Sequence, residues 1–178
     1  MAAAMIEELL ADHERIRTYL DLFEEQAKRF AVGEDADISL LKRIAEFFAE
    51  FPDQRHHRLE DLIYDQLVRR GEELLSLREE HERVLAGVTL FRDAVGQILL
   101  DQELPREEFA RTALNFIRAY RAHFEAEEKD VFPRAQSLTG DDWKEIARGV
   151  AAIDAEPIEP LRRARLNAAE EAIAAYLD

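Results

Sequence analysis

The 178-residue chain contains no cysteine. Disulfides, zinc–thiolate sites and iron–sulfur clusters are therefore excluded, and any bound metal must be held by His, Asp and Glu side chains. Glycine and proline are also scarce, with six and five residues. Because 47% of the residues are hydrophobic and 35% are charged, helix formers dominate over turn residues. The composition predicts an all-α fold with a real core.

Positive charge is in short supply as well. The 24 Lys and Arg residues stand against 39 Asp and Glu residues, which gives a net charge of −15. Such a chain repels phosphate backbones, so we expect no nucleic-acid binding. No stretch approaches the roughly 20 apolar residues of a membrane span, and the N-terminus has no signal-peptide pattern. We therefore expect a cytoplasmic protein that does not enter membranes.

Four segments carry apolar residues at alternating spacings of three and four, which indicates amphipathic bundle helices. They cover residues 6–30, 39–71, 72–100 and 105–133. Ser39 is expected to cap the second segment, and Pro133 to end the fourth. Pro52 predicts a kink or short break at Phe51–Asp53. Residues 1–135 are thus expected to form a four-helix bundle.

Residues 136–178 are predicted to form a C-terminal helical extension. Thr139 and Asp142 resemble a capping box that opens a helix through about Ile153, and Leu161–Leu177 follows as a last helix. No ligand-type residues cluster here. We expect this extension to cover the bundle or to mediate self-association into a homo-oligomer.

Four of the five histidines fall on the apolar face of their helix, one in each predicted helix: His13, His56, His81 and His123. Glu60 and Glu127 follow two of these histidines by four residues. Such a pair lies about 40° apart around a helix, so both side chains can face one point. One such histidine alone is more often a core residue with a single hydrogen bond. Burying four imidazoles and two carboxylates without partners would cost several kcal/mol each, so together they predict a metal site.

An internal repeat relates these residues. The sequence DHERI at residues 12–16 parallels EHERV at 80–84, and HHRLED at 56–61 parallels HFEAEE at 123–128. The separation is 68 residues from His13 to His81, and 67 from His56 to His123 and from Glu60 to Glu127. Two helix pairs related by a pseudo-twofold axis would bring the six donors to one level. Two ions sharing both carboxylates fit this symmetry better than one saturated octahedral ion, and the donors favour iron, with manganese or zinc possible.

The neighbours of these residues receive plainer predictions. His57 lies about 100° around the helix from His56, so we expect it to face outward or to support a ligand from behind. Asp61 and Glu128 are expected on a solvated face. Glu14 and Glu82 are expected at the helix surface, and Tyr120 in the core.

The pieces DHERI, HHRLED, EHERV and HFEAEEKDVFP resemble the bacterial hemerythrin-like HHE cation-binding domains, over about Met5–Arg134. The resemblance implies an up-down-up-down bundle with a non-haem di-iron centre bridged by an oxo or hydroxo group. By position, His13 and His56 would bind one iron, His81 and His123 the other, and Glu60 and Glu127 would bridge them. Oxygen-carrying hemerythrins have a further histidine one turn before His81, where this chain has Leu77. The more open site resembles di-iron proteins of the nitrosative-stress response and of iron-centre repair, which usually carry an additional Cys-containing domain that this sequence lacks.

Three functions remain open at this point. The first is a di-iron protein that binds or reduces a small oxidant such as O2, NO or peroxide. The second is an iron-handling or redox-, oxygen- or NO-sensing module that acts through a partner, including repair of iron centres. The third is a structural metal site without reactivity.

Overall fold

The computed structural model describes residues 2–51, 55–74, 77–100 and 102–177, except the side chains of residues 77 and 78. These residues form helices, turns and loops, with no strand among them, so the predicted all-α fold is confirmed. The bundle is built from α1 (Ala2–Ala31), α2 (Ile38–Phe51), α3 (His57–Arg69), α4 (Leu77–Leu99) and α5 (Arg106–Ala126).

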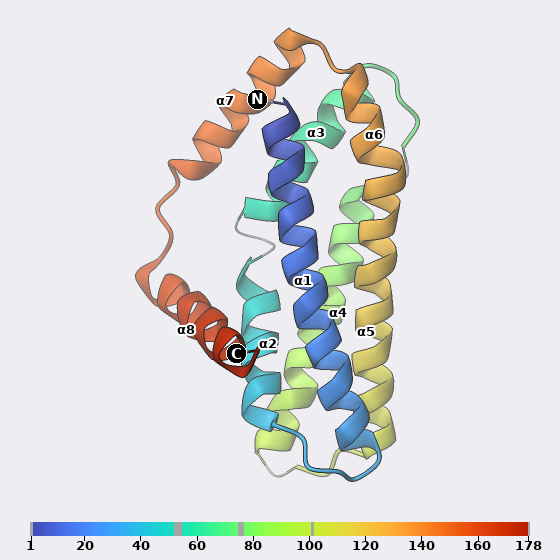
Figure 1. Cartoon of the computed structure of the whole chain (residues 1–178), viewed down its shortest axis with the longest axis vertical. Helices are drawn as coiled ribbons and strands as arrows, with labels where there is room; N and C mark the ends of the chain where they lie inside the picture. The colour runs from blue at the N-terminus through green and yellow to red at the C-terminus, as the bar shows by residue number, and fades with distance from the viewer. Residues whose placement is uncertain (1, 52–54, 75–76, 101, 178) are drawn as a thin grey trace.

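The helices run up-down-up-down (Figure 1). The second rod of the bundle is divided into α2 and α3, and it packs against α4 through both parts. α1 packs against α5 and α2, and α4 also packs against α5. The predicted kink at Phe51–Asp53 falls on residues 52–54, which lie outside the described part of the chain.

Several predicted helix ends are shifted. The third helix begins at Leu77 and not at Glu72, because residues 72–74 are not helical. Asp37, and not Ser39, caps α2, since its Oδ1 accepts the backbone N–H of Leu40 at 2.9 Å. Pro133 does not end the fourth helix. The chain continues through a π-helical turn at Glu127–Val131, the short helix α6 (Phe132–Arg134) and a 3-10 turn at Ala135–Ser137.

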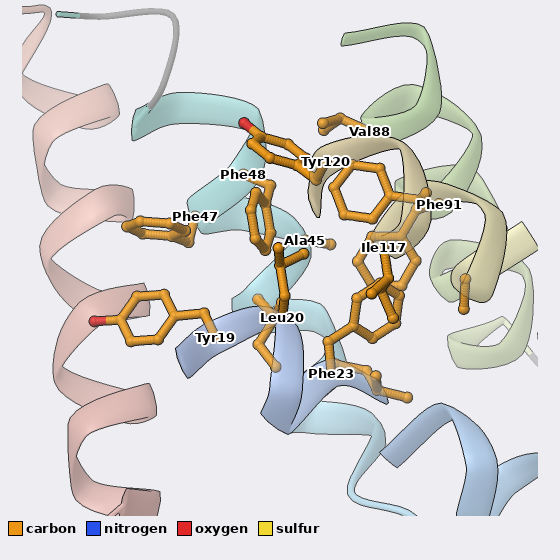
Figure 2. Close-up of a cluster of buried hydrophobic side chains, with 14 of the residues drawn as sticks. Tyr19, Leu20, Phe23, Ala45, Phe47, Phe48, Val88, Phe91, Ile117 and Tyr120 are labelled. Carbon is orange, nitrogen blue, oxygen red and sulfur yellow. The ribbon is translucent and has the colours of Figure 1, made fainter. Parts of the chain in front are cut away.

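Two apolar clusters fill the bundle, one toward each end. The larger contains Ile16, Phe23, Phe91 and Phe116 with their neighbours, part of which Figure 2 shows. The smaller lies around α3 and the start of α1, and includes Leu9. His13 sits on α1 between Leu9 of one cluster and Ile16 of the other. The polar residues of the candidate site therefore lie between two dry layers.

The C-terminal extension covers the bundle, as expected. Thr139 and Asp142 form the predicted capping box at the start of α7 (Gly140–Asp154), which packs on α3. Gly149 allows this close approach, because a Cβ there would lie 2.6 Å from a methyl group of Leu62. The last helix, α8 (Pro160–Leu177), packs along α2, with Ala169 and Ile173 fully buried. The division at residue 135 and self-association stay predictions.

Candidate metal centre

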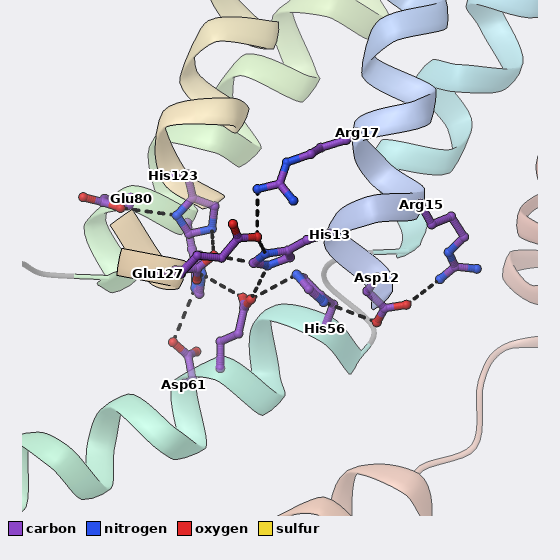
Figure 3. A network of polar contacts seen from close by, with 12 residues as sticks. Asp12, His13, Arg15, Arg17, His56, Asp61, Glu80, His123 and Glu127 are labelled. Atoms are coloured by element: carbon purple, nitrogen blue, oxygen red, sulfur yellow. Dashed lines mark hydrogen bonds and ion pairs between the residues drawn. The ribbon is translucent and has the colours of Figure 1, made fainter. Parts of the chain in front are cut away.

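The six predicted donors come together inside the bundle, where Figure 3 labels His13, His56, His123 and Glu127. They come from every rod: His13 from α1, His56 and Glu60 from the start of α3, His81 from α4, and His123 and Glu127 from the end of α5. All six are buried, and the most accessible of them, His81, is only 9% exposed.

Glu60 lies at the centre of three imidazoles. Its Oε1 is 3.2 Å from Nε2 of His13 and 3.0 Å from Nε2 of His56. Its Oε2 is 3.3 Å from Nε2 of His81. A single carboxylate thus faces histidines from three different rods of the bundle.

Glu127 completes the ring from the opposite side. Its Oε2 is 3.4 Å from Nε2 of both His13 and His123, and its Oε1 is 3.7 Å from Nε2 of His81. The backbone N–H of Glu127 bonds to the carbonyl of His123, so the predicted helical i+4 relation holds up to this residue. The π-helical turn that begins at Glu127 is a feature often found at functional sites.

The outward-facing nitrogens of the histidines contact four further carboxylates. The Nδ1–H of His56 donates to Asp12 at 3.3 Å, and that of His123 donates to Glu80 at 3.3 Å. Asp12 and Glu80 are themselves repeat equivalents, 68 residues apart. Because a carboxylate accepts hydrogen bonds, it fixes the proton on Nδ1 and leaves Nε2 as the donor to a cation.

The other two histidines, His13 and His81, each contact a carboxylate from the other half of the internal repeat. The Nδ1–H of His13 donates to Glu128 at 2.8 Å, and Nδ1 of His81 is 3.4 Å from Asp61. The prediction that Asp61 and Glu128 belong to a solvated face is therefore wrong. Both are partly buried, because the side of the helix next to each buried glutamate faces a neighbouring rod.

Other predictions for the neighbours have mixed outcomes. Glu14 and Glu82 are exposed, as expected, and Tyr120 is fully buried in the larger apolar cluster. The side chain of Leu77 lies outside the described part of the structure. Sequence reasoning missed the roles of Asp12 and Glu80, although their position in the repeat, directly before a predicted ligand, was a usable signal.

Of the two places predicted for His57, the outward one is wrong and the place beside a predicted ligand is right. His57 is buried, and its ring stacks on that of His81 with centroids 4.2 Å apart. The reason is that α3 inserts between its neighbours: His56 lies against His13 of α1, with centroids 5.1 Å apart, while His57 faces α4. Two helix faces about 100° apart are thus buried at once.

Without a metal ion, protons on the converging side chains compensate part of the negative charge of the buried carboxylates. Burial raises the pKa of Glu127, and the nearby charge of Glu60 raises it further. Burial also opposes ionisation of Glu60, but the contacts with His56 and His13 hold its pKa well below the usual range. Burial disfavours the charged form of His56, yet Glu60 and Asp12 raise its pKa to about 10.

The remaining imidazoles respond in opposite directions. Burial opposes protonation of His81, but Asp61, Glu127 and Glu60 raise its pKa to about 11. For His123, burial dominates and lowers the pKa. Several of the converging groups therefore carry a proton where a cation would satisfy the same carboxylates.

Several converging atoms have no hydrogen-bond partner within the described residues: Nε2 of His56, His81 and His123, Oε2 of Glu60, and both carboxylate oxygens of Glu127. Buried polar atoms of this kind are costly unless a partner exists. Two donor groups each bring their ligand atoms within 4.8 Å of one another, namely His13–His56–Glu60 and His57–Glu60–His81–His123. The donor set thus fits a metal site.

Comparison with protein families agrees with this geometry. The model of the hemerythrin HHE cation-binding domain matches residues 4–135 and, in an overlapping match, residues 74–174. Residues 74–135 belong to both matches, once as the second part of the family pattern and once as its beginning. A helical hairpin that is repeated within the chain would give this result. No curated protein and no solved structure gives a significant match. With the first match spanning most of the chain, this protein belongs to the hemerythrin HHE cation-binding domain family.

Proposed function

We propose that this protein holds two iron ions and binds or reduces a small oxidant, namely O2, NO or peroxide. The proposed ligands are those predicted from the sequence: His13 and His56 for one ion, His81 and His123 for the other, and Glu60 and Glu127 shared between them. One observation carries the proposal. All four imidazoles turn Nε2 toward the same two buried carboxylates, while outer carboxylates contact every Nδ1.

The donor chemistry favours iron over the alternatives. Imidazole and carboxylate ligands without thiolate suit iron, and manganese or zinc accept the same set. Zinc has no redox chemistry of its own. When bound, a ferrous pair supplies two electrons and exchangeable coordination positions.

The side chains of the protein keep the site dry. Phe124 stacks on the imidazole of His13 with centroids 3.9 Å apart. Phe132 also stacks on this imidazole, with centroids 5.5 Å apart. These rings wall off one side of the donors from water. A low local dielectric strengthens every charge interaction in the site and limits proton leakage to a reactive ligand.

A small hollow reaches the other side of the site. It has a volume of about 180 Å³, and it is lined by Glu80, Arg83, Val84, Ala119, Ala122 and His123. Two of these lining residues are alanines on α5, so bulk is low beside a proposed ligand. A hollow of this size has ample room for a diatomic molecule or peroxide beside His123, which is compatible with a small oxidant.

The test combines metal content with optical spectra. Protein loaded with ferrous iron without oxygen should contain about two irons per chain, and its absorption should change on addition of O2, NO or peroxide. Ala122→Phe should slow that change by filling the hollow, whereas Ala86→Phe, at an exposed site on α4 outside the hollow, should not. Two bound irons with no optical response to any of the three molecules would refute the proposal.

A second candidate is an iron-handling or sensing module that acts through a partner. It is favoured by a chain of polar contacts between α8 and the site. Glu170 accepts from Nη1 of Arg15 at 2.9 Å, Nη2 of Arg15 donates to Asp12 at 2.9 Å, and Asp12 contacts His56. A change at the metal could therefore reach the surface helix that covers α2.

Hydrogen exchange of α8 distinguishes the two candidates. Under the sensing hypothesis, protection of Pro160–Leu177 should differ between metal-free, reduced and oxidised protein, and Arg15→Met should remove that difference. Protection that is the same in all three states would eliminate the sensing role for this helix.

A further inference from the structure

One difference between the two halves of the repeat replaces an imidazole ring by a phenyl ring beside the site. His57 precedes its repeat equivalent by 67 residues, and that equivalent is Phe124. The two rings occupy matching places. Phe124 stacks on His13 at 3.9 Å with an interplanar angle of 19°, and His57 stacks on His81 at 4.2 Å with an angle of 18°. One half of the site thus has a phenyl ring where the other has an imidazole.

Packing alone does not require a histidine at position 57. A phenyl ring fills the equivalent place in the other half, and Phe124 is fully buried. An imidazole is more costly than a phenyl ring to remove from water. The chain nevertheless places His57 in a buried position, only 5% exposed, among other nitrogen and oxygen donors.

The donor geometry shows which ion a nitrogen of His57 could reach. Its ligand atom lies within 4.8 Å of those of Glu60, His81 and His123. Two nitrogens on one ion with bonds of about 2.1 Å are at most about 4.2 Å apart. Because imidazole lone pairs lie in the ring plane, His57 would have to turn out of its stack on His81 to bind the same ion as His81 and His123. The His13–His56 side has no corresponding nitrogen, since Phe124 stands there.

From this asymmetry we infer that His57 is an additional ligand for the ion on the His81–His123 side, and that the two metal positions differ in affinity. This inference rests on the proposed function, because it assumes that two ions bind. The position next to His57 has an extra imidazole and should fill first. The position next to Phe124 has fewer donors and should fill second.

The test is a Co(II) titration followed by absorption, whose intensity reports the coordination of the ion. The wild-type protein should bind two Co(II) ions in separate steps. His57→Phe copies the ring of Phe124, so it preserves stacking on His81 and removes only the nitrogens. It should weaken the first step by at least about tenfold, change the spectrum of the first ion, and leave the second step within twofold.

Tyr64→Phe, an aromatic replacement elsewhere on α3, is the matched control and should bind like wild type. A His57→Phe protein with wild-type affinities and spectrum would overturn the inference and leave the two-ion proposal intact. Failure of the wild-type protein to bind two ions would instead contradict the proposed function.

A second measurement does not depend on how the variant folds. In the Co(II)-loaded wild-type protein, each bound histidine gives one strongly shifted, solvent-exchangeable ring N–H resonance in the proton spectrum. Five such resonances are expected if all five histidines of the chain bind. Four would show that His57 does not bind an ion and would overturn the inference.

Discussion

Glu80→Gln tests whether the outer carboxylates prepare the site for metal. Glu80 accepts from Nδ1 of His123 at 3.3 Å, and its side chain is 19% exposed. Glutamine keeps the length and can still accept through its amide oxygen, but it removes the negative charge that makes the imidazole a stronger ligand. The change leaves the inner donors untouched.

The expected loss of metal affinity in the Glu80→Gln protein can be given an approximate size. Replacing such an outer partner typically weakens metal binding by 10- to 100-fold. Because Glu80 is partly exposed, water and salt screen its charge, so we expect the lower end, about tenfold or about 1.4 kcal/mol. The same substitution at Glu82, an exposed glutamate two residues further along α4, should change the affinity less than twofold.

Competition with a chromogenic chelator measures both affinities, and circular dichroism checks that each variant is folded. Metal content at saturation should stay the same in both variants, because no inner ligand is removed. Equal affinities for the Glu80→Gln and Glu82→Gln proteins would refute the reasoning, since the carboxylate beside His123 would then contribute nothing beyond a surface charge.

Further changes should act on metal content and stability separately. Glu127→Ala removes a fully buried carboxylate and should lower the metal content of the loaded protein, measured by elemental analysis. Adding metal at about 100 times its Kd should stabilise the fold by about 2.7 kcal/mol, and a chelator should reverse the rise in Tm. Phe23→Ala, in the middle of the larger cluster, should cost about 3–5 kcal/mol in urea unfolding, whereas Leu90→Ala at an exposed position should cost under about 0.5 kcal/mol. Thr139→Ala should cost about 1 kcal/mol by removing the cap of α7.

The helical pattern was readable from the sequence because burial constrains it. A residue on the buried stripe of a long bundle helix has few alternative orientations, so His13, His81 and His123 could be placed inside from spacing alone. The i+4 pairs then fixed the two glutamates. The repeat added the partner relations between helices, which periodicity within a single helix does not contain.

The surroundings of the donors could not be read in the same way. A residue next to a ligand lies about 100° away around the helix, and its environment depends on how neighbouring helices are set. α3 is inserted between α1 and α4, so His57 is buried together with His56. Asp61 and Glu128 turn inward for a related reason. Only comparison between the repeat halves, which aligns His57 with buried Phe124, carried a hint of this.

Helix ends were less predictable, because local alternatives compete there. Asp37 and Ser39 are both good capping residues, two positions apart. Which of them caps α2 depends on the path of the preceding loop, and in the structure it is Asp37. Pro133 lies in the first turn of α6, directly after the π-helical turn. Proline is best tolerated in the first turn of a helix, so the chain continues where the sequence suggested a stop.

The electrostatics of the network in Figure 3 give a separate reason for expecting bound cations. Two inner and four outer carboxylates converge on the imidazoles. Arg15 and Arg17 contact Asp12 and Glu128, but they are shared with Glu170 and Glu14. Negative groups therefore outnumber the arginines beside them, and charges around a buried site interact several times more strongly than in water. Divalent cations would offset this excess. In the metal-free protein, the raised pKa values of His56, His81 and Glu127 show protons taking up part of the same imbalance.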